Sequence, residues 1–399
     1  MKKIIVLAIL LSISYCSMQF INASSEGGTQ KEFSNSLKIT LNDDFQTLMR
    51  IDTIIGEVLV QFDLNTQITY FSSIECEDCL YFGDQKATRF NCLKEFSCVK
   101  SGTFQDVQIS QDYIASGDLI DVRMVLDDVH FYLHGVYLIK SLYSNNQNPS
   151  KFAYQRIGLL LASESNQKYE SQIFFSLYNQ GKINKISYSL YYDEDLQNYQ
   201  LTIPDYDSRL IPSRQSLFNL TLGWDGVFEY QKRYIFSGHL DFCGQQMLEK
   251  NTLNFYLDPS VNDHVFQIDE SYFEDFNKFL IEHRREPDLS LFTVEQPGQW
   301  SQNQYFTLGI QIDIDQKGKL PKPKQFDVQF SSDQVMLYEG QGYYTINVNF
   351  IKDKFNFILG KRIFSKYLYY LYKDEQDQYK VALAPLQHKQ QSLRKVQFI

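Results

Sequence analysis

Short apolar runs broken by glycine, asparagine, aspartate and serine set the pattern of this chain. In the first half, four such runs occur at Val58–Phe62, Ile68–Phe71, Val122–Leu126 and Phe131–Ile139. Runs of this length between turn-forming residues predict β-strands. Near the end of the chain, two more apolar runs predict strands at Phe355–Phe364 and Tyr367–Tyr372. Because long helical periodicity is scarce, the pattern predicts an all-β fold.

The clearest helical spacing occurs in two short segments. Ile173–Leu177 is followed by Asn179-Gln180-Gly181, and glycine commonly ends a helix. Ser271–His283 carries aromatic and leucine side chains at intervals of three and four residues, which predicts a helix packed against a core. The polar stretch Asp193–Arg209 contains a proline and is the expected connection between two halves of the chain.

Length and composition agree with a two-part β protein. A chain of 399 residues is too long for one ordinary core and predicts two domains. The 28 tyrosines and 31 phenylalanines favour strands. A net charge of −10 argues against nucleic acid or an anionic membrane surface as a partner, because either would require a basic patch.

The N-terminus has the pattern of a secretion signal. Two lysines precede the apolar run Ile4–Ile13, which has the length of a signal-peptide core and is too short to span a bilayer easily. We therefore predict a signal peptide at 1–23, a polar segment at 24–44 and no membrane anchor. The expected location is the secretory pathway, with an extracellular, vacuolar or lysosomal destination.

Four cysteines crowd one short segment, at Cys76, Cys79, Cys92 and Cys98. In an oxidising compartment they predict two disulfides, for which three connectivities are possible. Zinc is the competing interpretation, but the second pair is spaced too widely for a usual zinc knuckle, so we expect no metal. Cys243 is then either a buried thiol or an intermolecular link. Asn219-Leu220-Thr221 is a sequon for glycosylation at Asn219.

Two segments bring an apolar run directly to an aspartate. Val58–Thr66 contains Asp63, and Asn254–Val261 contains Asp258; in each, the aspartate is followed by a polar or small-residue turn. The two aspartates are 195 residues apart, which is about the length of one compact domain. This spacing suggests two similar lobes that each bring one carboxylate to a shared cleft. Paired carboxylates at a cleft are typical of acid–base catalysis.

The order of these segments resembles that of pepsin-like aspartic proteases. Asp63–Thr66 reads Asp-Leu-Asn-Thr where the family has Asp-Thr-Gly-Ser/Thr, and Leu257–Val261 stands at the second such turn. Phe357–Gly360 resembles the family's Trp-Ile-Leu-Gly. Tyr113–Gly117 resembles its flap, and Leu177–Gly181 resembles its Leu-Trp-x-Gln-Gly helix end. The resemblance extends over roughly Phe45 to Pro385.

This resemblance implies a bilobal pepsin-like fold, with an N-terminal lobe at 45–200, a C-terminal lobe at 201–399 and a central cleft between two antiparallel β lobes. It implies that Asp63 and Asp258 form a catalytic dyad that activates a water and hydrolyses peptide bonds at acidic pH. The implied supporting residues of the dyad are Asn65, Thr66 and Ser260, and those of the flap are Tyr113 and Gly117. A peptide or protein substrate, no cofactor and a monomeric state are expected.

The two turns depart from the family pattern. Asn65 and Ser260 replace glycines whose backbone freedom lets amide groups reach the carboxylates. Pro259 has no N–H group and restricts the residue before it. The alternative prediction is therefore a catalytically inactive pepsin-fold protein that binds peptide or protein ligands in the cleft.

Overall fold

The computed structural model describes much of the chain between Ser36 and Gln387 and shows a mostly β protein. The described residues are 36–51, 57–83, 89–92, 98–110, 112–149, 151–161, 172–213, 217–220, 222–228, 231–242, 245–247, 253–258, 261, 265–269, 271, 293–295, 305–311, 325–331, 336–340, 343–346, 348–350, 355–376 and 378–387. Within them, strands dominate and form four sheets, which confirms the prediction of an all-β fold class.

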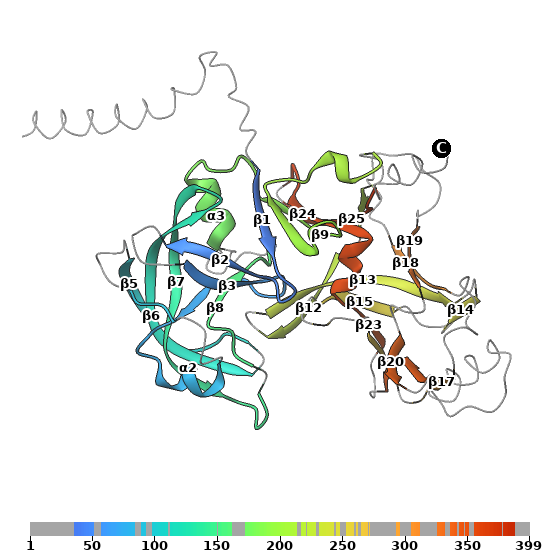
Figure 1. Ribbon diagram of the computed structural model, residues 1–399, viewed down its shortest axis with the longest axis horizontal. Coiled ribbons are helices and arrows are strands. Elements are labelled where there is room, and N and C mark those ends of the chain that lie inside the picture. The colour runs from blue at the N-terminus through green and yellow to red at the C-terminus, as the bar shows by residue number, and fades with distance from the viewer. Residues whose placement is uncertain are drawn as a thin grey trace, which may run out of the picture. The chain divides into compact units, whose positions relative to one another are not determined.

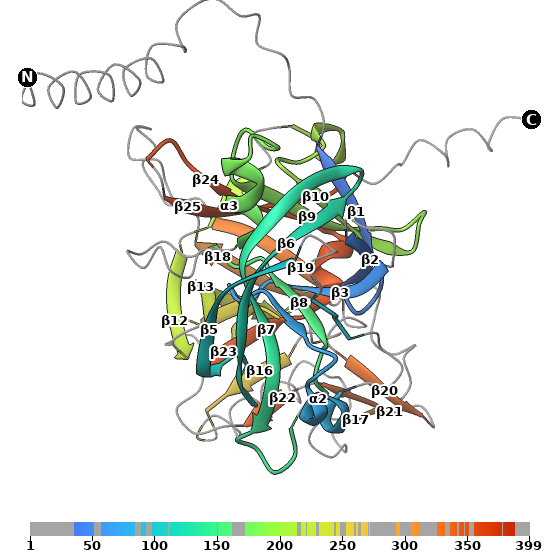
Figure 2. The same ribbon diagram turned by 90° about the vertical axis from the view of Figure 1, so that its left-hand side faces the viewer.

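The first half of the chain forms a seven-stranded sheet. Its strands lie in the spatial order β2 (Gln46–Ile51), β3 (Glu57–Asp63), β8 (Gln155–Gly158), β4 (Tyr70–Ser72), β7 (Val129–Ser144), β6 (Tyr113–Leu126) and β5 (Cys98–Gln108). Figure 2 shows β6 and β7 as the two long strands that cross the face turned toward the viewer.

A six-stranded sheet joins segments from both ends of the chain. Its order is β1 (Leu37–Leu41), β10 (Asn198–Ile203), β9 (Ser187–Asp193), β24 (Tyr367–Lys373), β25 (Tyr379–Pro385) and β11 (Phe218–Asn219). The pairing of β9 with β24 brings together residues about 180 positions apart, and both strands lie near the middle of Figure 1.

The second half contributes a nine-stranded sheet and a small three-stranded sheet. The main path of the nine-stranded sheet is β19 (Gln325–Ser331), β18 (Tyr305–Gln311), β13 (Gln231–Phe242), β15 (Leu253–Leu257), β23 (Phe355–Leu359), β16 (Val265–Ile268) and β22 (Val348–Phe350). The strands β12 (Leu222–Phe228) and β14 (Gln245–Met247) pair with β13 beside that path. The small sheet contains β17 (Thr293–Glu295), β21 (Tyr343–Ile346) and β20 (Met336–Gly340).

The described residues include two α-helices, α2 (Glu77–Phe82) and α3 (Gln172–Asn179), and two 3₁₀ helices, η3 (Ser208–Leu210) and η6 (Lys361–Ser365). The helix predicted at Ile173–Leu177 is confirmed as α3. Gly181 has a φ of +64°, so it ends the helix in the left-handed conformation that glycine adopts most easily.

Alternating burial explains why these residues form the sheet that carries Asp63. In β3, Val58, Val60 and Phe62 are buried while the residues between them are exposed or half-buried. This period of two is the pattern of a strand with one face in a core. The core continues across the chain, because one hydrophobic cluster includes both Leu64, next to Asp63, and Leu257, next to Asp258.

One predicted element is wrong, and another contains a strand that was not predicted. The run Phe355–Phe364 is not one strand: β23 ends at Leu359, and η6 then places Ile363 and Phe364 in the core. The stretch Asp193–Arg209 is not only a connection, because residues 198–203 form strand β10. Its residues after Asn198 are all buried, which shows that this polar-looking segment is an interior strand.

Several predictions fall outside the described residues. These are the signal peptide at 1–23, most of the polar segment at 24–44, the helix expected over Ser271–His283 beyond its first residue, and the side chain of Cys243. Over the ranges that the structure describes, no helix combines the length and apolar character needed to cross a membrane.

Candidate functional site

Asp63 lies at the end of a parallel strand pair. β3 pairs with β8, with Gln61 opposite Arg156 and Asp63 opposite Gly158. The turn after the aspartate folds back on this pair. The Leu159 N–H donates to the Asp63 carbonyl at 2.8 Å, and the Leu160 N–H donates to the Thr66 carbonyl at 3.0 Å. The aspartate is therefore held where two strand ends and a tight turn meet.

Asp258 lies at the end of a second parallel pair. β15 pairs with β23, with Leu257 opposite Leu359. The Asp258 N–H donates to the Leu359 carbonyl at 3.0 Å, and the Val261 N–H donates to the Asp258 carbonyl at 3.1 Å. The Lys361 N–H then donates to the Val261 carbonyl at 2.8 Å, which ties this turn to the end of β23.

The two halves of the chain repeat one arrangement of four strands. The spatial order β3-β8-β4-β7 recurs as β15-β23-β16-β22, with the same sequence of parallel, antiparallel and parallel pairings.

The register of the repeat is also shared. Tyr70 follows Asp63 by seven residues and pairs with the residue two before Gly158. Val265 follows Asp258 by seven residues and pairs with the residue two before Gly360. Asp63 and Asp258 thus occupy equivalent places in a duplicated structure.

Arg156 contacts Asp63 directly, a contact that was not predicted from the sequence. Its Nη1 atom lies 3.0 Å from Asp63 Oδ2, and the two side chains are only 15% and 18% exposed. The guanidinium carbon lies 5.6 Å from the centre of the Tyr70 ring, within range of a cation–π interaction. Burial lowers the pKa of Arg156, but Tyr70 and Asp63 raise it, and the net shift is upward. The side chain is therefore a cation held against a carboxylate.

The two copies differ at the position of this arginine. The residue two before Gly158 is Arg156, whereas the residue two before Gly360 is Ile358, which is buried. An ion pair thus flanks the first aspartate, and an apolar side chain occupies the equivalent position in the second copy.

Asn65 supports Asp63 through its backbone. The Asn65 N–H donates to Asp63 Oδ1 at 2.8 Å. Asn65 does not have a positive φ, so this position does not need the backbone freedom of a glycine. The amide reaches the carboxylate without a glycine.

Thr66 stabilises the turn itself. It is 1% exposed, and its hydroxyl oxygen accepts a hydrogen bond from the Ile68 N–H at 3.2 Å. Ser260, the corresponding support predicted near Asp258, lies outside the described residues.

Tyr113 and Gly117, the predicted flap residues, lie in β6 beside the turn that joins it to β5. The Tyr113 side chain is buried and packs edge-on against Phe82 and Phe152, with ring centres 5.3 and 5.2 Å apart. Gly117 is at a bulge, where a Cβ atom would collide with the Leu138 carbonyl. Both residues therefore have packing roles, and their role in a flap stays a prediction.

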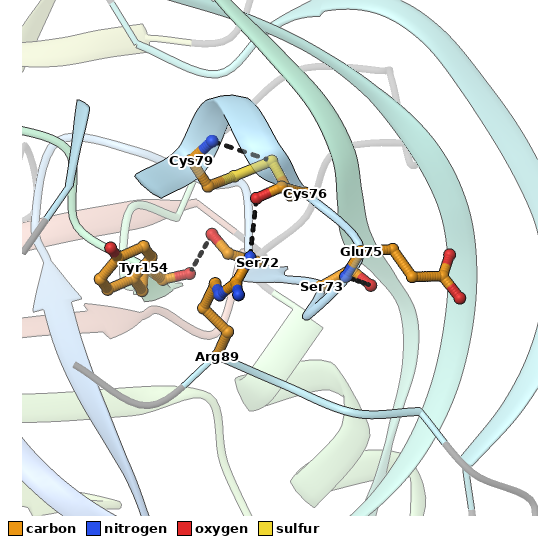
Figure 3. The surroundings of a disulfide bond; sticks show 7 residues. All are labelled: Ser72, Ser73, Glu75, Cys76, Cys79, Arg89 and Tyr154. Carbon is orange, nitrogen blue, oxygen red and sulfur yellow. Dashed lines mark hydrogen bonds between the residues drawn. A yellow bond between two sulfur atoms is a disulfide. The ribbon is translucent and has the colours of Figure 1, made fainter. Parts of the chain in front are cut away.

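The predicted disulfides are confirmed, with the connectivity Cys76–Cys79 and Cys92–Cys98. Figure 3 shows the first of them at the start of α2. The Cys76 sulfur accepts the Cys79 N–H at 3.3 Å, and the Cys76 carbonyl accepts a hydrogen bond from Arg89 at 2.9 Å. The same buried cluster contains Tyr70 and Tyr113, so this disulfide packs in the core beside the Asp63 site.

Asn219, the predicted glycosylation site, lies in β11 at the edge of the six-stranded sheet. The Tyr372 hydroxyl donates to its Oδ1 atom at 3.0 Å. The side chain is thus half-buried and oriented by a neighbour, and its glycosylation stays a prediction. Within the described ranges, no group of three histidine, cysteine or acidic side chains has the spacing of a metal site.

Comparisons with protein-family models and with curated protein sequences found no match to this chain. The resemblance to pepsin-like proteases therefore depends on the residues and strand pairings described above.

Proposed function

We propose that this chain is a secreted pepsin-like aspartic endopeptidase that uses Asp63 and Asp258. The observation that carries this proposal is the duplicated four-strand arrangement, which has an aspartate at the same point of each copy. A plain structural β protein has no need for two such turns. The two disulfides and the lack of a membrane-spanning helix among the described residues are compatible with secretion.

The proposed reaction needs both carboxyl groups at one water molecule. In the reaction we propose, one carboxyl group acts as the base and the other as the acid at this water molecule and the scissile bond. The ionised carboxylate takes a proton from the water as its oxygen attacks the scissile carbonyl carbon. The protonated carboxyl gives its proton to the carbonyl oxygen, which forms a tetrahedral intermediate with two hydroxyl groups. The C–N bond then breaks as the amine nitrogen takes the proton that came from the water, and one hydroxyl group returns a proton to the second carboxylate. In this proposal, the lobes at 45–200 and 201–399 hold the peptide in the cleft between them.

A binding protein without catalysis is the second candidate, and Pro259 is the observation that favours it. Proline has no N–H group, so the second turn has one donor fewer for orienting Asp258. Such a protein would keep the fold and bind peptide or protein ligands between the two turns.

Cleavage of a mixed peptide library separates the two candidates. We expect the purified protein to cleave peptides at a pH of about 3 to 5, where one of two coupled carboxyl groups can hold a proton. The variants Asp63→Asn and Asp258→Asn should each abolish cleavage while remaining folded by circular dichroism. A folded parent protein that cleaves nothing across this range would contradict the peptidase proposal and leave the binding protein.

A further inference from the structure

Asp63 has a polar neighbour at each of its two carboxylate oxygens. The Asn65 amide donates a hydrogen bond to Oδ1, and the Arg156 guanidinium forms an ion pair with Oδ2. Contacts at both oxygens fix the plane of a carboxylate more firmly than a contact at one oxygen does.

The turn does not provide this second contact by itself. The hydroxyl of Thr66 accepts the Ile68 N–H, and Leu64 has no polar atom in its side chain. The guanidinium comes instead from β8, where Arg156 lies opposite Gln61 in the parallel pair and opposite Tyr70 in the antiparallel pair. Both neighbouring strands therefore hold the arginine in place.

Keeping an arginine in this position is unfavourable unless its partner is present. The side chain is 15% exposed, and its Nε atom is buried with no hydrogen-bond partner among the described residues. Burying a charge costs free energy, which only a well-placed counterion offsets. Simple packing does not require an arginine here, because Ile358 fills the equivalent place of the second copy.

We propose that Arg156 is a positioning residue for Asp63, and that its ion pair with Oδ2 adds to the one hydrogen bond that the turn gives to Oδ1. This inference rests on the proposed function, because orienting Asp63 matters only if the carboxylate acts on a ligand. Arg156 does not itself touch the reacting atoms in this proposal. It holds the Asp63 carboxylate in one plane, so that the other oxygen lone pairs face the water or ligand.

The test compares Arg156→Met, Arg156→Lys and a matched control, Arg123→Met. Arg123 also lies over a tyrosine ring, with its guanidinium carbon 6.0 Å from the centre of the Tyr132 ring, but it is on β6 and away from Asp63. We expect Arg156→Met to lower kcat about 100-fold with little change in KM, because a misoriented group loses rate without losing substrate affinity. Arg156→Lys keeps the charge and should restore part of kcat. Arg123→Met should keep the parent kcat.

A purely structural role predicts a different result. It would lower the amount of folded protein, measured by circular dichroism, and leave kcat per folded molecule unchanged. That result, or a rise in kcat for Arg156→Met, would overturn the inference while leaving the peptidase proposal intact. If Arg156→Met does not fold, the test uses the kcat of Arg156→Lys instead. A kcat below that of the parent supports the inference, and a kcat equal to that of the parent overturns it.

A parent protein that cleaves nothing refutes the peptidase proposal, and a binding measurement then decides the role of Arg156. The probe is a peptide with a tetrahedral hydroxyl-bearing carbon in place of the scissile carbonyl, and its affinity is measured by calorimetry. Binding that is at least about tenfold weaker in Arg156→Met than in Arg123→Met supports the inference, because such a probe depends on an oriented carboxylate. Equal binding, or no binding by the parent, overturns it.

Discussion

Gly158 lies directly beneath the turn that carries Asp63. A Cβ atom at this position would lie 2.6 Å from the Gln67 carbonyl carbon and would also collide with the Thr66 carbonyl oxygen. These are backbone atoms of the turn, so they can move only if the turn moves. The glycine therefore lets β8 approach the loop closely enough for Asp63 to pair with it.

Gly158→Ala should lower the free energy of unfolding by about 1–3 kcal/mol, because the added methyl group forces the turn away from β8. Urea denaturation measures the change. Gly102→Ala is the matched control, since a Cβ atom there would lie 3.4 Å from Leu119 Cδ1 in β6, a flexible side chain. If the two substitutions destabilise the protein equally, the close approach at Gly158 is not what constrains this position.

Sequence patterns identified the two aspartates but not the residue that contacts the first of them. Asp63 follows an apolar run and precedes turn residues, so local pattern was enough to select it. Arg156 is 93 positions away, and its neighbours Gln155 and Ile157 give no sign of a charge partner. The ion pair depends on the register between β3 and β8, which no local pattern encodes.

At the scale of elements, the end of α3 is fixed by backbone and side-chain hydrogen bonds together. The Lys182 N–H donates to the Leu177 carbonyl at 2.8 Å, across the left-handed Gly181. The Gln180 side chain then pairs with both backbone groups of Tyr132 in β7, at 2.8 and 2.7 Å. The segment thus locks the helix end to the edge of a strand.

Gly181→Ala should destabilise the protein by about 1–2 kcal/mol, the cost of left-handed backbone for a residue with a Cβ atom. Apart from its chain neighbours, no described residue has an atom within 4 Å of that Cβ position, so we attribute the effect to backbone conformation. Thermal unfolding followed by circular dichroism measures it. Gly181→Asn should lower the stability clearly less than Gly181→Ala does, because asparagine tolerates the left-handed conformation. If both substitutions lower the stability equally, backbone conformation is not the cause.

The two disulfides should differ in their resistance to reduction. Cys76 and Cys79 are both fully buried, whereas Cys92 is only partly buried. A reducing thiolate must reach a sulfur atom, so we expect a mild reductant to open Cys92–Cys98 first. Alkylation and mass spectrometry identify the free cysteines over time. As a control, both disulfides should be reduced at similar rates in the urea-unfolded protein. In the native protein, reduction of Cys76–Cys79 before Cys92–Cys98 would contradict the order expected from burial.

Most strands could be located from the sequence, but their partners could not. The runs Val58–Phe62 and Phe131–Ile139 lie within β3 and β7, because alternating burial leaves a local pattern. β10 was missed, because Asn198, Gln200 and Thr202 made a buried strand look like a polar connection. The parallel pairings that place the aspartates join segments about 100 residues apart, and apolar periodicity carries no information on them.

At the scale of the whole molecule, the six-stranded sheet links the two ends of the described chain. β1 pairs with β10, and β9 pairs with β24, so strands that begin at Leu37 and end at Pro385 belong to one sheet. Loss of either end would expose the edge of this sheet and its buried side chains. The six-stranded sheet thus contains strands from before, between and after the two aspartate turns.

Proposed activity at acidic pH requires that the folded structure be stable there, and two carboxyl groups with a lowered pKa contribute to that stability. Burial raises the pKa of Asp118, but the hydrogen bonds from Lys100 and Lys140 together lower it by more. The net pKa is therefore below the ordinary value of 3.8. Hydrogen bonds from Arg209 lower the pKa of Asp207 to about 2. Groups with a lowered pKa stabilise the folded state above their unfolded pKa, and this contribution is lost as the pH falls through the folded pKa.

The contribution of these two groups to thermal stability should therefore stay nearly constant from neutral pH to about pH 4 and fall between pH 3.8 and about 2. Circular dichroism melting curves across this range measure it. Asp118→Asn and Asp207→Asn should lower the melting temperature at neutral pH and flatten the acid-induced fall, because the uncharged amide no longer titrates. Asp128→Asn is the control: Asp128 pairs with Arg50 on the exposed surface, where an ion pair contributes little. If stability were lost well above pH 4, groups other than these two would control acid unfolding, and a peptidase active at pH 3 to 5 would need a different source of stability.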